Sequence, residues 1–367
     1  MAAHTGFLLI ADITGYTIYL GRSELEHARD TISALLETVI SGTRPPLVIS
    51  KLEGDAVLSY GLEASFLGGQ TLMEMIEDCY VGFRNAIELM VLNNTCRCNA
   101  CANLDSLDLK FFLHHGEFVI QQVGDRAELF GSDVILAHRL LKNDVREATG
   151  IAAYTLYTHK AVERIGVALT EEMSRHTLTY EDIGTIAVRV QDMHPVWQAR
   201  RGQATAALAP DEIVVEVATD VALSPETVWD YLADPEFRNV LMGSDRQEVL
   251  DRKQGRITEG SAFQCFHGDR VVPQVILEWR PFERVVTRDL LPVPAGASYL
   301  VSVCELHPIE GGTRLVQQAG WLTGPWIGRT ISRIFLRASR KSSQRDIDAF
   351  GSRIESDALS RGVKAEA

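Results

Sequence analysis

The chain has 367 residues, of which 46% are hydrophobic and 23% charged, and this composition excludes a disordered, collagen-like or repeat-dominated protein. At roughly 150 residues per domain, the length predicts about two domains, each able to bury its own core. The formal net charge of -13 predicts no nucleic-acid partner, because phosphate recognition needs a basic surface.

The first residues contain no basic stretch followed by a long apolar run, so we expect no signal peptide, no transmembrane segment and a cytoplasmic location. The apolar run at residues 6–13 predicts a buried strand, with Asp12 near its end. Residues 25–40 predict a helix. Two β-rich runs within residues 45–60 predict a hairpin that turns at Asp55.

The middle of the chain alternates helices and strands. Apolar residues spaced three and four apart predict an amphipathic helix over residues 70–92. Residues 107–123 predict a second hairpin that turns near Gly116, and residues 131–141 predict another helix. Residues 199–210 follow neither periodicity, and we expect the domain boundary there.

The C-terminal half begins with a predicted strand at residues 213–218. Ser224 precedes Pro225, which is the pattern of a helix N-cap followed by a proline at the first helical position. Residues 246–322 predict a run of strands, and residues 326–354 predict a long closing helix. The whole pattern predicts an α+β protein.

Four blocks of the N-terminal half follow one another between residues 6 and 195. They are Phe-Leu-Leu-Ile-Ala-Asp-Ile-Thr-Gly-Tyr-Thr (7–17), Lys-Leu-Glu-Gly-Asp-Ala-Val-Leu (51–58), Leu-His-His-Gly-Glu-Phe-Val-Ile-Gln-Gln-Val-Gly (113–124) and Gly-Ser-Asp-Val-Ile-Leu-Ala-His-Arg-Leu (131–140). In this order they resemble the opening strand, second motif, central hairpin and catalytic helix of class III adenylyl and guanylyl cyclases. The resemblance implies a ferredoxin-like, nucleotide-binding cyclase domain over residues 1–198, with a role in signalling.

Asp12 and Asp55 are the candidate metal ligands. A carboxylate at a strand end and a second one in a neighbouring turn can share divalent cations, which assist in-line attack on phosphorus. The resemblance implies that both bind Mg²⁺ or Mn²⁺, together with the carbonyl oxygen of Ile13.

The resemblance also implies a nucleotide site and a dimer. The implied residues are the purine-reading Lys51 and Glu128, the triphosphate-binding Arg126 and Arg189, and the catalytic Arg139. In the family the active site forms between two cyclase domains. This chain has one, so an active form is a homodimer in which Asp12 and Asp55 face Lys51, Glu128 and Arg139 of a second copy.

One position departs from the family pattern. Active members have an asparagine four residues before the catalytic arginine, on the same helical face, and this chain has Ile135. Losing one positioning contact commonly lowers the rate by about 10²–10³. Two interpretations stay open: a slow adenylyl cyclase, or a non-catalytic sensor or adaptor that uses the domain for dimerisation or nucleotide reading.

Three cysteines crowd into six residues as Cys96-Arg-Cys98-Asn-Ala-Cys101. This spacing places three thiolates within reach of one zinc ion. The candidates for a fourth ligand are Cys79, Asp105, His114 and His115. Free or redox-active thiols are the alternative. The insert is similar to that of a poorly characterised, cyclase-related bacterial family.

Residues 211–358 resemble the START-like SRPBCC family with its helix-grip fold, on the blocks Ile-Val-Val-Glu-Val-Ala (213–218) and Ser-Pro-Glu-Thr-Val-Trp-Asp-Tyr-Leu-Ala-Asp-Pro (224–235). The resemblance implies a cavity for a hydrophobic small molecule. The expected lining residues, each of which could instead pack in the core, are Phe263, Phe266, Trp279, Tyr299 and Trp321. We expect this ligand to control the cyclase-like half. In the alternative interpretation the direction of control is reversed: the protein binds a lipid or polyketide, and its N-terminal half is regulatory.

Overall fold

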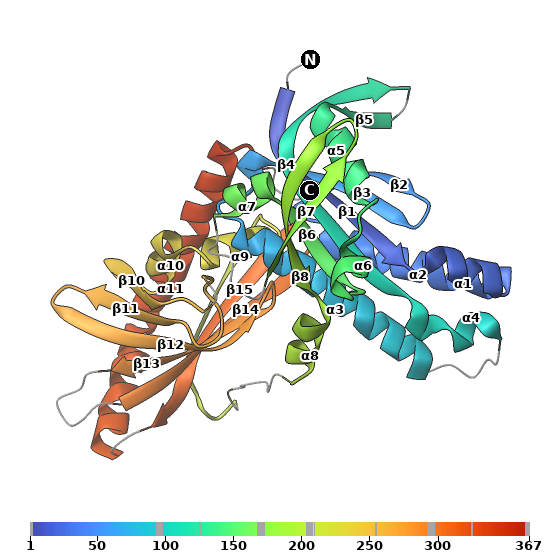
Figure 1. The fold of residues 1–367 in the computed structure, drawn as a ribbon. Helices are drawn as coiled ribbons and strands as arrows, with labels where there is room; N and C mark the ends of the chain where they lie inside the picture. The colour runs from blue at the N-terminus through green and yellow to red at the C-terminus, as the bar shows by residue number, and fades with distance from the viewer. Residues whose placement is uncertain are drawn as a thin grey trace. The chain divides into compact units, whose positions relative to one another are not determined.

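The computed structural model describes residues 3–92, 98–124, 126–166, 173–202, 208, 210–253, 255–291, 298–323 and 326–363. By its contacts the chain divides into two compact units (Figure 1). The first unit comprises Met1–Ala64 and Leu72–Gln203, and the second comprises Ser65–Thr71 and Ala204–Ala367. Both combine helices with one sheet, so the predicted α+β class is confirmed.

The first unit is built on a sheet with the strand order β2-β3-β1-β4-β6-β8-β7, and β5 pairs with β4. Its elements are β1 (Ala3–Thr14), α1 (Tyr16–Arg22), α2 (Leu25–Thr43), β2 (Val48–Glu53), β3 (Ala56–Leu62), the 3₁₀ turn Glu63–Ser65, α3 (Gln70–Leu92), α4 (Asn99–Ala102), the 3₁₀ turn Leu104–Ser106, β4 (Asp108–Val123), β5 (Arg126–Phe130), α5 (Ser132–Leu140), α6 (Val145–Thr149), β6 (Tyr154–Thr158), α7 (His159–Ile165), β7 (Ser174–Tyr180), β8 (Gly184–Asp192) and α8 (His194–Gly202). The strand at residues 6–13, the hairpin at 45–60 and the helix at 70–92 match the sequence prediction.

Strand β1 is the centre of this sheet. Its residues Phe7–Ala11 are all buried, which explains why the apolar run is continuous rather than alternating: both faces are covered. Leu8 and Ile10 point into one core cluster with Val134 and Ala137 of α5. The sheet therefore holds α5 against the middle of β1 and β4.

The predicted hairpin at residues 107–123 is wrong, because β4 is one continuous strand that pairs antiparallel with the whole of β1. Gly116 lies opposite Gly6 in this ladder. A glycine is needed at 116 for another reason: a Cβ there would overlap the Asp133 carboxylate. The turn occurs beyond it, where Gly124 with φ 62° precedes β5.

The second unit has the helix-grip order: a strand, two short helices, a run of strands and a long closing helix. Its elements are β9 (Ile213–Val221), α9 (Pro225–Leu232), α10 (Pro235–Leu241), β10 (Arg246–Asp251), β11 (Ala262–His267), β12 (Arg270–Arg280), β13 (Arg284–Leu291), β14 (Ser298–Ile309), β15 (Gly312–Thr323) and α11 (Trp326–Ser360). The antiparallel sheet has the order β10-β11-β12-β13-β14-β15-β9. The predicted cap is confirmed: the Ser224 hydroxyl accepts a bond from the Thr227 amide at 3.3 Å.

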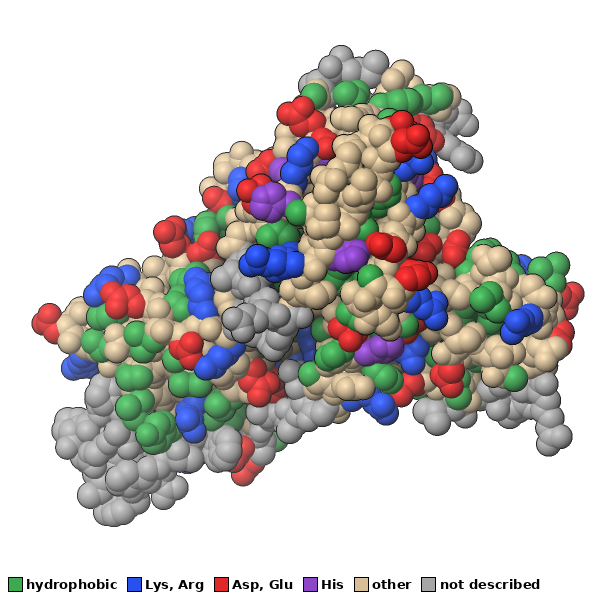
Figure 2. Space-filling view, in the orientation of Figure 1, with side chains coloured by type: hydrophobic (Ala, Val, Ile, Leu, Met, Phe, Trp, Pro, Cys, Tyr) green, Lys and Arg blue, Asp and Glu red, His purple; other side chains and the backbone are tan. Residues whose placement is uncertain are grey.

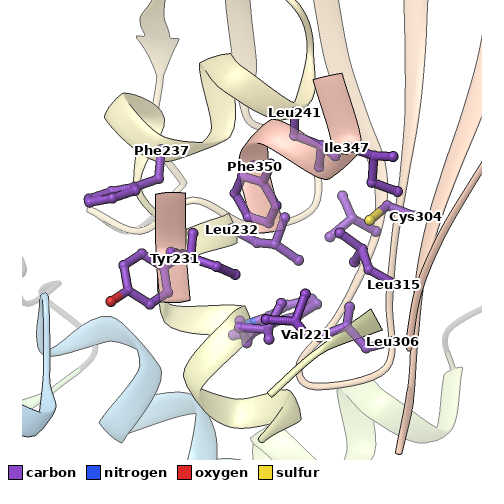
Figure 3. Close-up of a cluster of buried hydrophobic side chains, with 14 of the residues drawn as sticks. Val221, Tyr231, Leu232, Phe237, Leu241, Cys304, Leu306, Leu315, Ile347 and Phe350 are labelled. Atoms are coloured by element: carbon purple, nitrogen blue, oxygen red, sulfur yellow. The ribbon is translucent and has the colours of Figure 1, made fainter. Parts of the chain in front are cut away.

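The core of the second unit lies between this sheet and α11. Ile347 and Phe350 of α11 are fully buried among apolar side chains that include Leu232, Leu315 and Cys304 (Figure 3). Packing therefore covers the C-terminal part of α11, whereas Ile334 and Phe335 in its N-terminal part are 65% and 56% exposed.

The segment Ser65–Thr71 belongs to the second unit, which the predicted domain limits of 1–198 and 211–358 do not anticipate. Asp230 of α9 accepts bonds from the Leu67 amide at 2.6 Å and the Thr71 hydroxyl at 2.7 Å. Gln70 exchanges two bonds with the backbone of Ile257. These buried bonds anchor the segment.

Among the described residues, no helix has the length and apolar character needed to cross a membrane. On the face shown in Figure 2, Lys and Arg side chains are interspersed with Asp and Glu rather than gathered in one basic patch.

Candidate functional site

Asp12 and Asp55 meet at one end of the central strands. Asp12 lies near the end of β1, opposite Ala56 of β3. Asp55 lies in the β2–β3 turn, where Gly54 adopts a φ of 68°. The Ile13 amide donates to the Asp55 carbonyl at 3.2 Å, which fixes the turn against β1. The fold thus brings together the three residues predicted to hold metal.

The electrostatics of this pair suit a divalent cation. Burial and the neighbouring charge of Asp55 raise the pKa of Asp12 to about 6, although Lys110 acts in the opposite direction. Burial also raises the pKa of Asp55. The two carboxylates repel each other where water screens them poorly, and a cation would relieve that repulsion. Together with the Ile13 carbonyl they form an oxygen donor set of the kind that Mg²⁺ and Mn²⁺ prefer. The residues present therefore fit the implied metal.

Lys110 is a member of this site that the motifs did not identify. It lies opposite Asp12 on β4, and its Nζ is 5.2 Å from the centre of the Tyr154 ring. Burial lowers its pKa. A lone lysine within the buried run Leu109–Leu113 was a usable sequence signal, because charges are rarely buried without a partner.

The predicted purine-reading residues also come together within one chain. Lys51 Nζ of β2 lies 2.7 Å from Glu53 Oε1 and 3.9 Å from Glu128 Oε2 of β5. His138 Nδ1 is 3.2 Å from the other Glu53 oxygen. A partly exposed lysine flanked by two carboxylates offers both a donor and acceptors at the edge of the unit.

The predicted cationic residues are less closely grouped. Arg139 of α5 lies 3.7 Å from Asp182, with 46% of its side chain exposed. Ile135, one turn before it, is 58% exposed. Arg189 lies on β8 opposite Tyr157. The Arg126 side chain lies outside the part of the chain that the structure describes.

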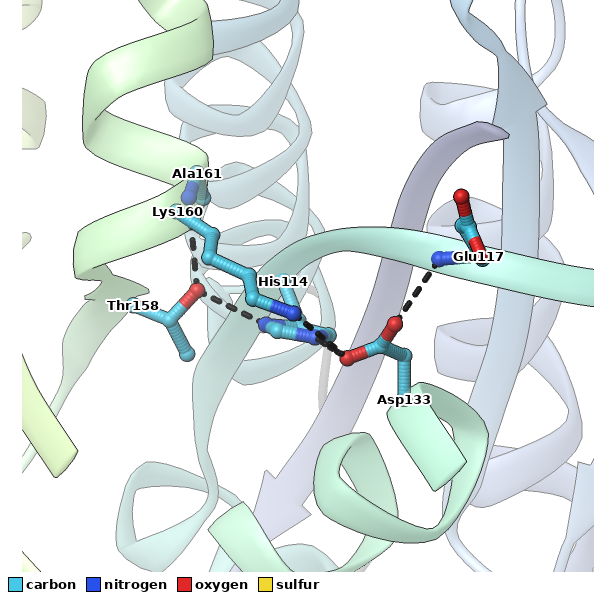
Figure 4. Close-up of polar contacts among 6 residues, drawn as sticks. All are labelled: His114, Glu117, Asp133, Thr158, Lys160 and Ala161. Carbon is cyan, nitrogen blue, oxygen red and sulfur yellow. Dashed lines mark hydrogen bonds and ion pairs between the residues drawn. The ribbon is translucent and has the colours of Figure 1, made fainter. Parts of the chain in front are cut away.

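Asp133 anchors the start of α5 to β4 (Figure 4). One of its oxygens accepts from the Glu117 amide at 2.8 Å, and the other is 2.9 Å from His114 Nε2 and 3.0 Å from Lys160 Nζ. His114 Nδ1 is 2.8 Å from the hydroxyl of Thr158. In Figure 4, Glu117, His114 and Lys160 converge on the Asp133 carboxylate, and Thr158 contacts the other side of the His114 ring.

This network fixes the protonation of His114. An ionised Asp133 carboxylate can only accept, so His114 Nε2 carries the proton donated to it, and in the neutral ring Nδ1 accepts from the Thr158 hydroxyl. Burial lowers the pKa of His114, which keeps the ring neutral. Because Asp133 is engaged in this anchor, it cannot replace the asparagine that the family has at position 135.

The cysteine cluster acquires a partner that spacing did not reveal. Cys98 is the N-cap of α4 and Cys101 lies within it, and His27 of α2 lies beside both: its Nδ1 is 3.1 Å from Cys98 Sγ and 3.9 Å from Cys101 Sγ. Cys96 lies outside the described residues. Since 71 residues separate His27 from Cys98, only the tertiary fold could identify it.

The residues considered as a fourth ligand are engaged elsewhere or exposed. Cys79 is buried with its thiol 3.8 Å from the Val39 carbonyl. His114 bonds to Asp133, and His115 Nε2 lies 3.6 Å from Glu63. Asp105 is exposed in its 3₁₀ turn.

The second unit contains a cavity of about 500 Å³. Apolar lining comes from β9, β14 and α11, including Val215, Leu300 and Leu336. Polar groups line it as well, including Gln274, Asp289, Ser302, Gln317 and the fully buried Ser332. A cavity of this size and mixed lining suits an apolar small molecule that carries a polar group.

The aromatic residues expected to line the cavity lie elsewhere. Phe263 and Trp279 are buried in the core, where Trp279 packs 4.5 Å from Trp229, ring centre to ring centre. Phe266 and Tyr299 stack against Arg246 and Arg288. The Trp321 side chain lies outside the described part of the chain. The one aromatic hydrocarbon side chain among the described lining residues is that of Phe335 on α11, which the sequence analysis did not select.

A buried polar cluster adjoins the cavity. Arg238 of α10 is 2% exposed and donates to Gln274 at 2.8 Å. Gln274 donates to Asp289 at 2.6 Å, and Ser302 donates to the other Asp289 oxygen at 2.8 Å. The Nη1 atom of Arg238 has no hydrogen-bond partner among the described residues. Burying an unsatisfied guanidinium nitrogen is costly unless a ligand completes its bonds.

Comparisons with known protein families match a part of each unit. The family of polyketide cyclases, dehydrases and lipid transport matches residues 212–355. A family of unknown function, DUF2652, matches residues 32–149. Among solved structures, the guanylyl cyclase Cya2 is 13% identical, with a TM-score of 0.41 over 52% of this chain and 92% of its own. The adenylyl cyclase CyaB from P. aeruginosa is 15% identical, with a TM-score of 0.38; the match covers 52% of this chain and 95% of CyaB.

One curated relative is much closer in sequence. It is the uncharacterized protein Rv2561/Rv2562 of Mycobacterium tuberculosis, 30% identical over 165 residues, which are 44% of this chain and 73% of the relative. At that identity and coverage, the chain belongs to the family of Rv2561/Rv2562.

Proposed function

We propose that the first unit binds ATP with divalent cations and works as a homodimeric, cyclase-like domain in signalling, with slow adenylyl cyclase activity. The observation that carries the proposal is the half-buried pair of Asp12 and Asp55, joined through the Ile13–Asp55 backbone bond. In an acidic protein, a triphosphate needs cations between itself and the carboxylates.

Each residue has a definable task in this proposal. Asp12, Asp55 and the Ile13 carbonyl would hold Mg²⁺ or Mn²⁺, which supplies charge neutralisation at the phosphates when bound. Arg126 and Arg189 add positive charge for the triphosphate, and Arg139 of a second copy stabilises charge that develops on the transferred phosphorus.

The Lys51–Glu128 pair favours adenine over guanine. The lysine donates to an acceptor nitrogen of the purine ring, and the carboxylate accepts from an exocyclic amino group. Adenine presents both groups on one edge, whereas guanine has a carbonyl oxygen and a ring N–H there. Lys51 then exchanges its contact with Glu128, 3.9 Å away, for one with the base.

Exposed apolar side chains support the homodimer. They occur on β2, β4, β5 and α5, elements in mutual contact, and comprise Val48, Leu52, Val123, Phe130 and Ile135. Each is at least 47% exposed. Apolar side chains exposed on neighbouring elements offer surface that a second copy would bury.

Titration calorimetry of the full-length protein with ATP, with and without Mn²⁺, tests the proposal. We expect ATP to bind only with the metal, GTP to bind at least about tenfold more weakly, and mass spectrometry to detect slow formation of cyclic AMP. Metal-dependent binding without product would assign the adaptor role. No binding of either nucleotide would refute the nucleotide proposal.

We propose that the second unit binds an apolar molecule with one oxygen-bearing head group, and that its occupancy controls the first unit. The apolar wall receives the body of the ligand, and Gln274 of the cavity lining, to which Arg238 donates at 2.8 Å, lies at the head group. Because Arg238 is buried behind this lining, its attraction for a negatively charged head is only weakly screened by water. In the alternative function, the protein is mainly a lipid- or polyketide-type ligand-binding protein that the first unit regulates. Its ligand would bind in this same cavity.

Dodecanoate and dodecanol test this head-group contact, since they differ only at the head. We expect Arg238→Met to weaken dodecanoate binding about tenfold and leave dodecanol within about twofold. Arg246→Met is the matched control, because that arginine stacks on Phe266 outside the cavity. If Arg238→Met unfolds, Ser332→Phe should block both ligands by filling the cavity.

Two results would contradict the second proposal. Wild-type protein that binds neither compound would leave the cavity without this class of ligand. Equal ATP affinity with and without saturating dodecanoate would remove the regulatory part.

A further inference from the structure

We propose that His27, Cys98 and Cys101 bind one Zn²⁺ ion, at a site separate from the nucleotide site. The three ligand atoms, one nitrogen and two sulfurs, all lie within 4.8 Å of one another. They come from α2 and from the two ends of α4, so the ion would join segments far apart in sequence.

The distances suit tetrahedral coordination. With Zn–S of about 2.3 Å and Zn–N of about 2.05 Å, a tetrahedral ion sets sulfur and nitrogen ligands about 3.6 Å apart. The two observed Nδ1–Sγ distances, 3.1 and 3.9 Å, lie on either side of this value. Small rotations of the side chains would complete the geometry.

The protein holds this arrangement with contacts independent of a metal. The Glu24 carboxylate accepts from the Ala100 amide at 3.1 Å and from the Asn99 side chain at 3.4 Å, so α4 is fastened next to the start of α2. The Cys101 amide donates to Cys98 Sγ at 3.4 Å, which holds the Cys98 thiol against the first turn of α4. A ligand set positioned before binding loses less entropy when the ion arrives.

The ligand chemistry selects zinc over the ions proposed for Asp12 and Asp55. Thiolate and imidazole are soft or intermediate ligands that favour Zn²⁺, whereas Mg²⁺ prefers carboxylate and carbonyl oxygens. Both cysteines are partly exposed and His27 is exposed, so ions can enter from solution. Three protein ligands leave the fourth position to water or an added ligand.

Zinc content of full-length protein purified in reducing buffer without chelators tests the site. We expect about one Zn²⁺ per chain in the wild type. His27→Ala and Cys101→Ser should each weaken zinc affinity at least about 100-fold in a chelator competition, because each removes one of three ligands. Cobalt-loaded wild type should show the visible absorption of a tetrahedral thiolate site.

Matched controls separate the site from general thiol and imidazole binding. His159→Ala removes an exposed histidine paired with Glu163, and Cys265→Ser removes a buried thiol of the second unit. Both should keep the wild-type zinc affinity. Cys96 is retained in every protein tested.

Two outcomes would overturn the inference. Wild-type protein that binds no zinc when the ion is added, or His27→Ala with wild-type affinity, would leave the cysteines as free thiols. Circular dichroism confirms that each variant is folded, and the exposure of His27 makes its replacement tolerable. Neither outcome bears on ATP binding, so the two proposals fail independently.

Discussion

Replacing Asp12 with asparagine should weaken ATP binding in the presence of Mn²⁺ by about 100-fold. Asparagine keeps the size of the side chain and removes one of the two half-buried carboxylates of Asp12 and Asp55. A loss of about 2.7 kcal/mol, the equivalent of 100-fold, is in the range of one charged contact in a partly buried site. Calorimetric titration with ATP, with and without Mn²⁺, measures it.

The stability of the same variant distinguishes a lost site from a damaged fold. Asp12 and Asp55 repel each other in the absence of a cation, so removing one charge should not lower the thermal midpoint of the metal-free protein. Asp105→Asn is the control, because Asp105 is exposed in its 3₁₀ turn. This variant should bind ATP as the wild type does. Metal-dependent binding that survives Asp12→Asn would show that the aspartates persist only as part of the fold.

Local sequence signals predicted much of the fold. Three features depend only on residues close together in the chain, so they can be predicted from the sequence. They are the continuous apolar run of β1, the Ser224 cap and the amphipathic period of α3. Strand β4 depended on long-range pairing with β1, and Gly116 suggested a turn that this pairing overrides. The place of Ser65–Thr71 in the second unit likewise depends on bonds to Asp230 and Ile257.

The candidate sites divide in the same way. Asp12, Asp55 and Lys51 lie in short motifs, Glu128 lies between two of them, and the structure brings each pair together. His27 and Arg238 have no motif of their own, because their role comes from residues distant in the chain. The aromatic residues predicted for the cavity, such as Trp279, fill the core instead. An aromatic side chain in a strand is predicted to be buried. Whether it faces the core or the cavity depends on the register of the folded sheet, which the sequence does not state.

The proposed slow turnover has a specific cause in α5. Ile135 is the residue one turn before Arg139, and its side chain is mostly exposed, so it supports no core contact. Its amide makes the first helical bond to the Gly131 carbonyl at 3.2 Å, and Asp133 fastens the same turn to β4. The backbone is therefore already held where a positioning side chain would be useful, and only the side chain is missing.

Ile135→Asn should raise the rate of cyclic AMP formation by about 10²-fold while ATP affinity changes less than about threefold. An amide can hydrogen-bond to the ribose and orient its attacking hydroxyl, and an orientation effect is expressed mainly in the transition state. The increase appears in kcat, measured by mass spectrometry of product at saturating ATP and Mn²⁺. Ile18→Asn is the matched control, because Ile18 is a similarly exposed isoleucine on α1 and should leave the rate unchanged. If Ile135→Asn binds ATP as the wild type does and yields no more product, position 135 does not limit catalysis. The adaptor interpretation would then replace the enzyme, because a folded domain with its metal ligands and a restored amide would still lack turnover.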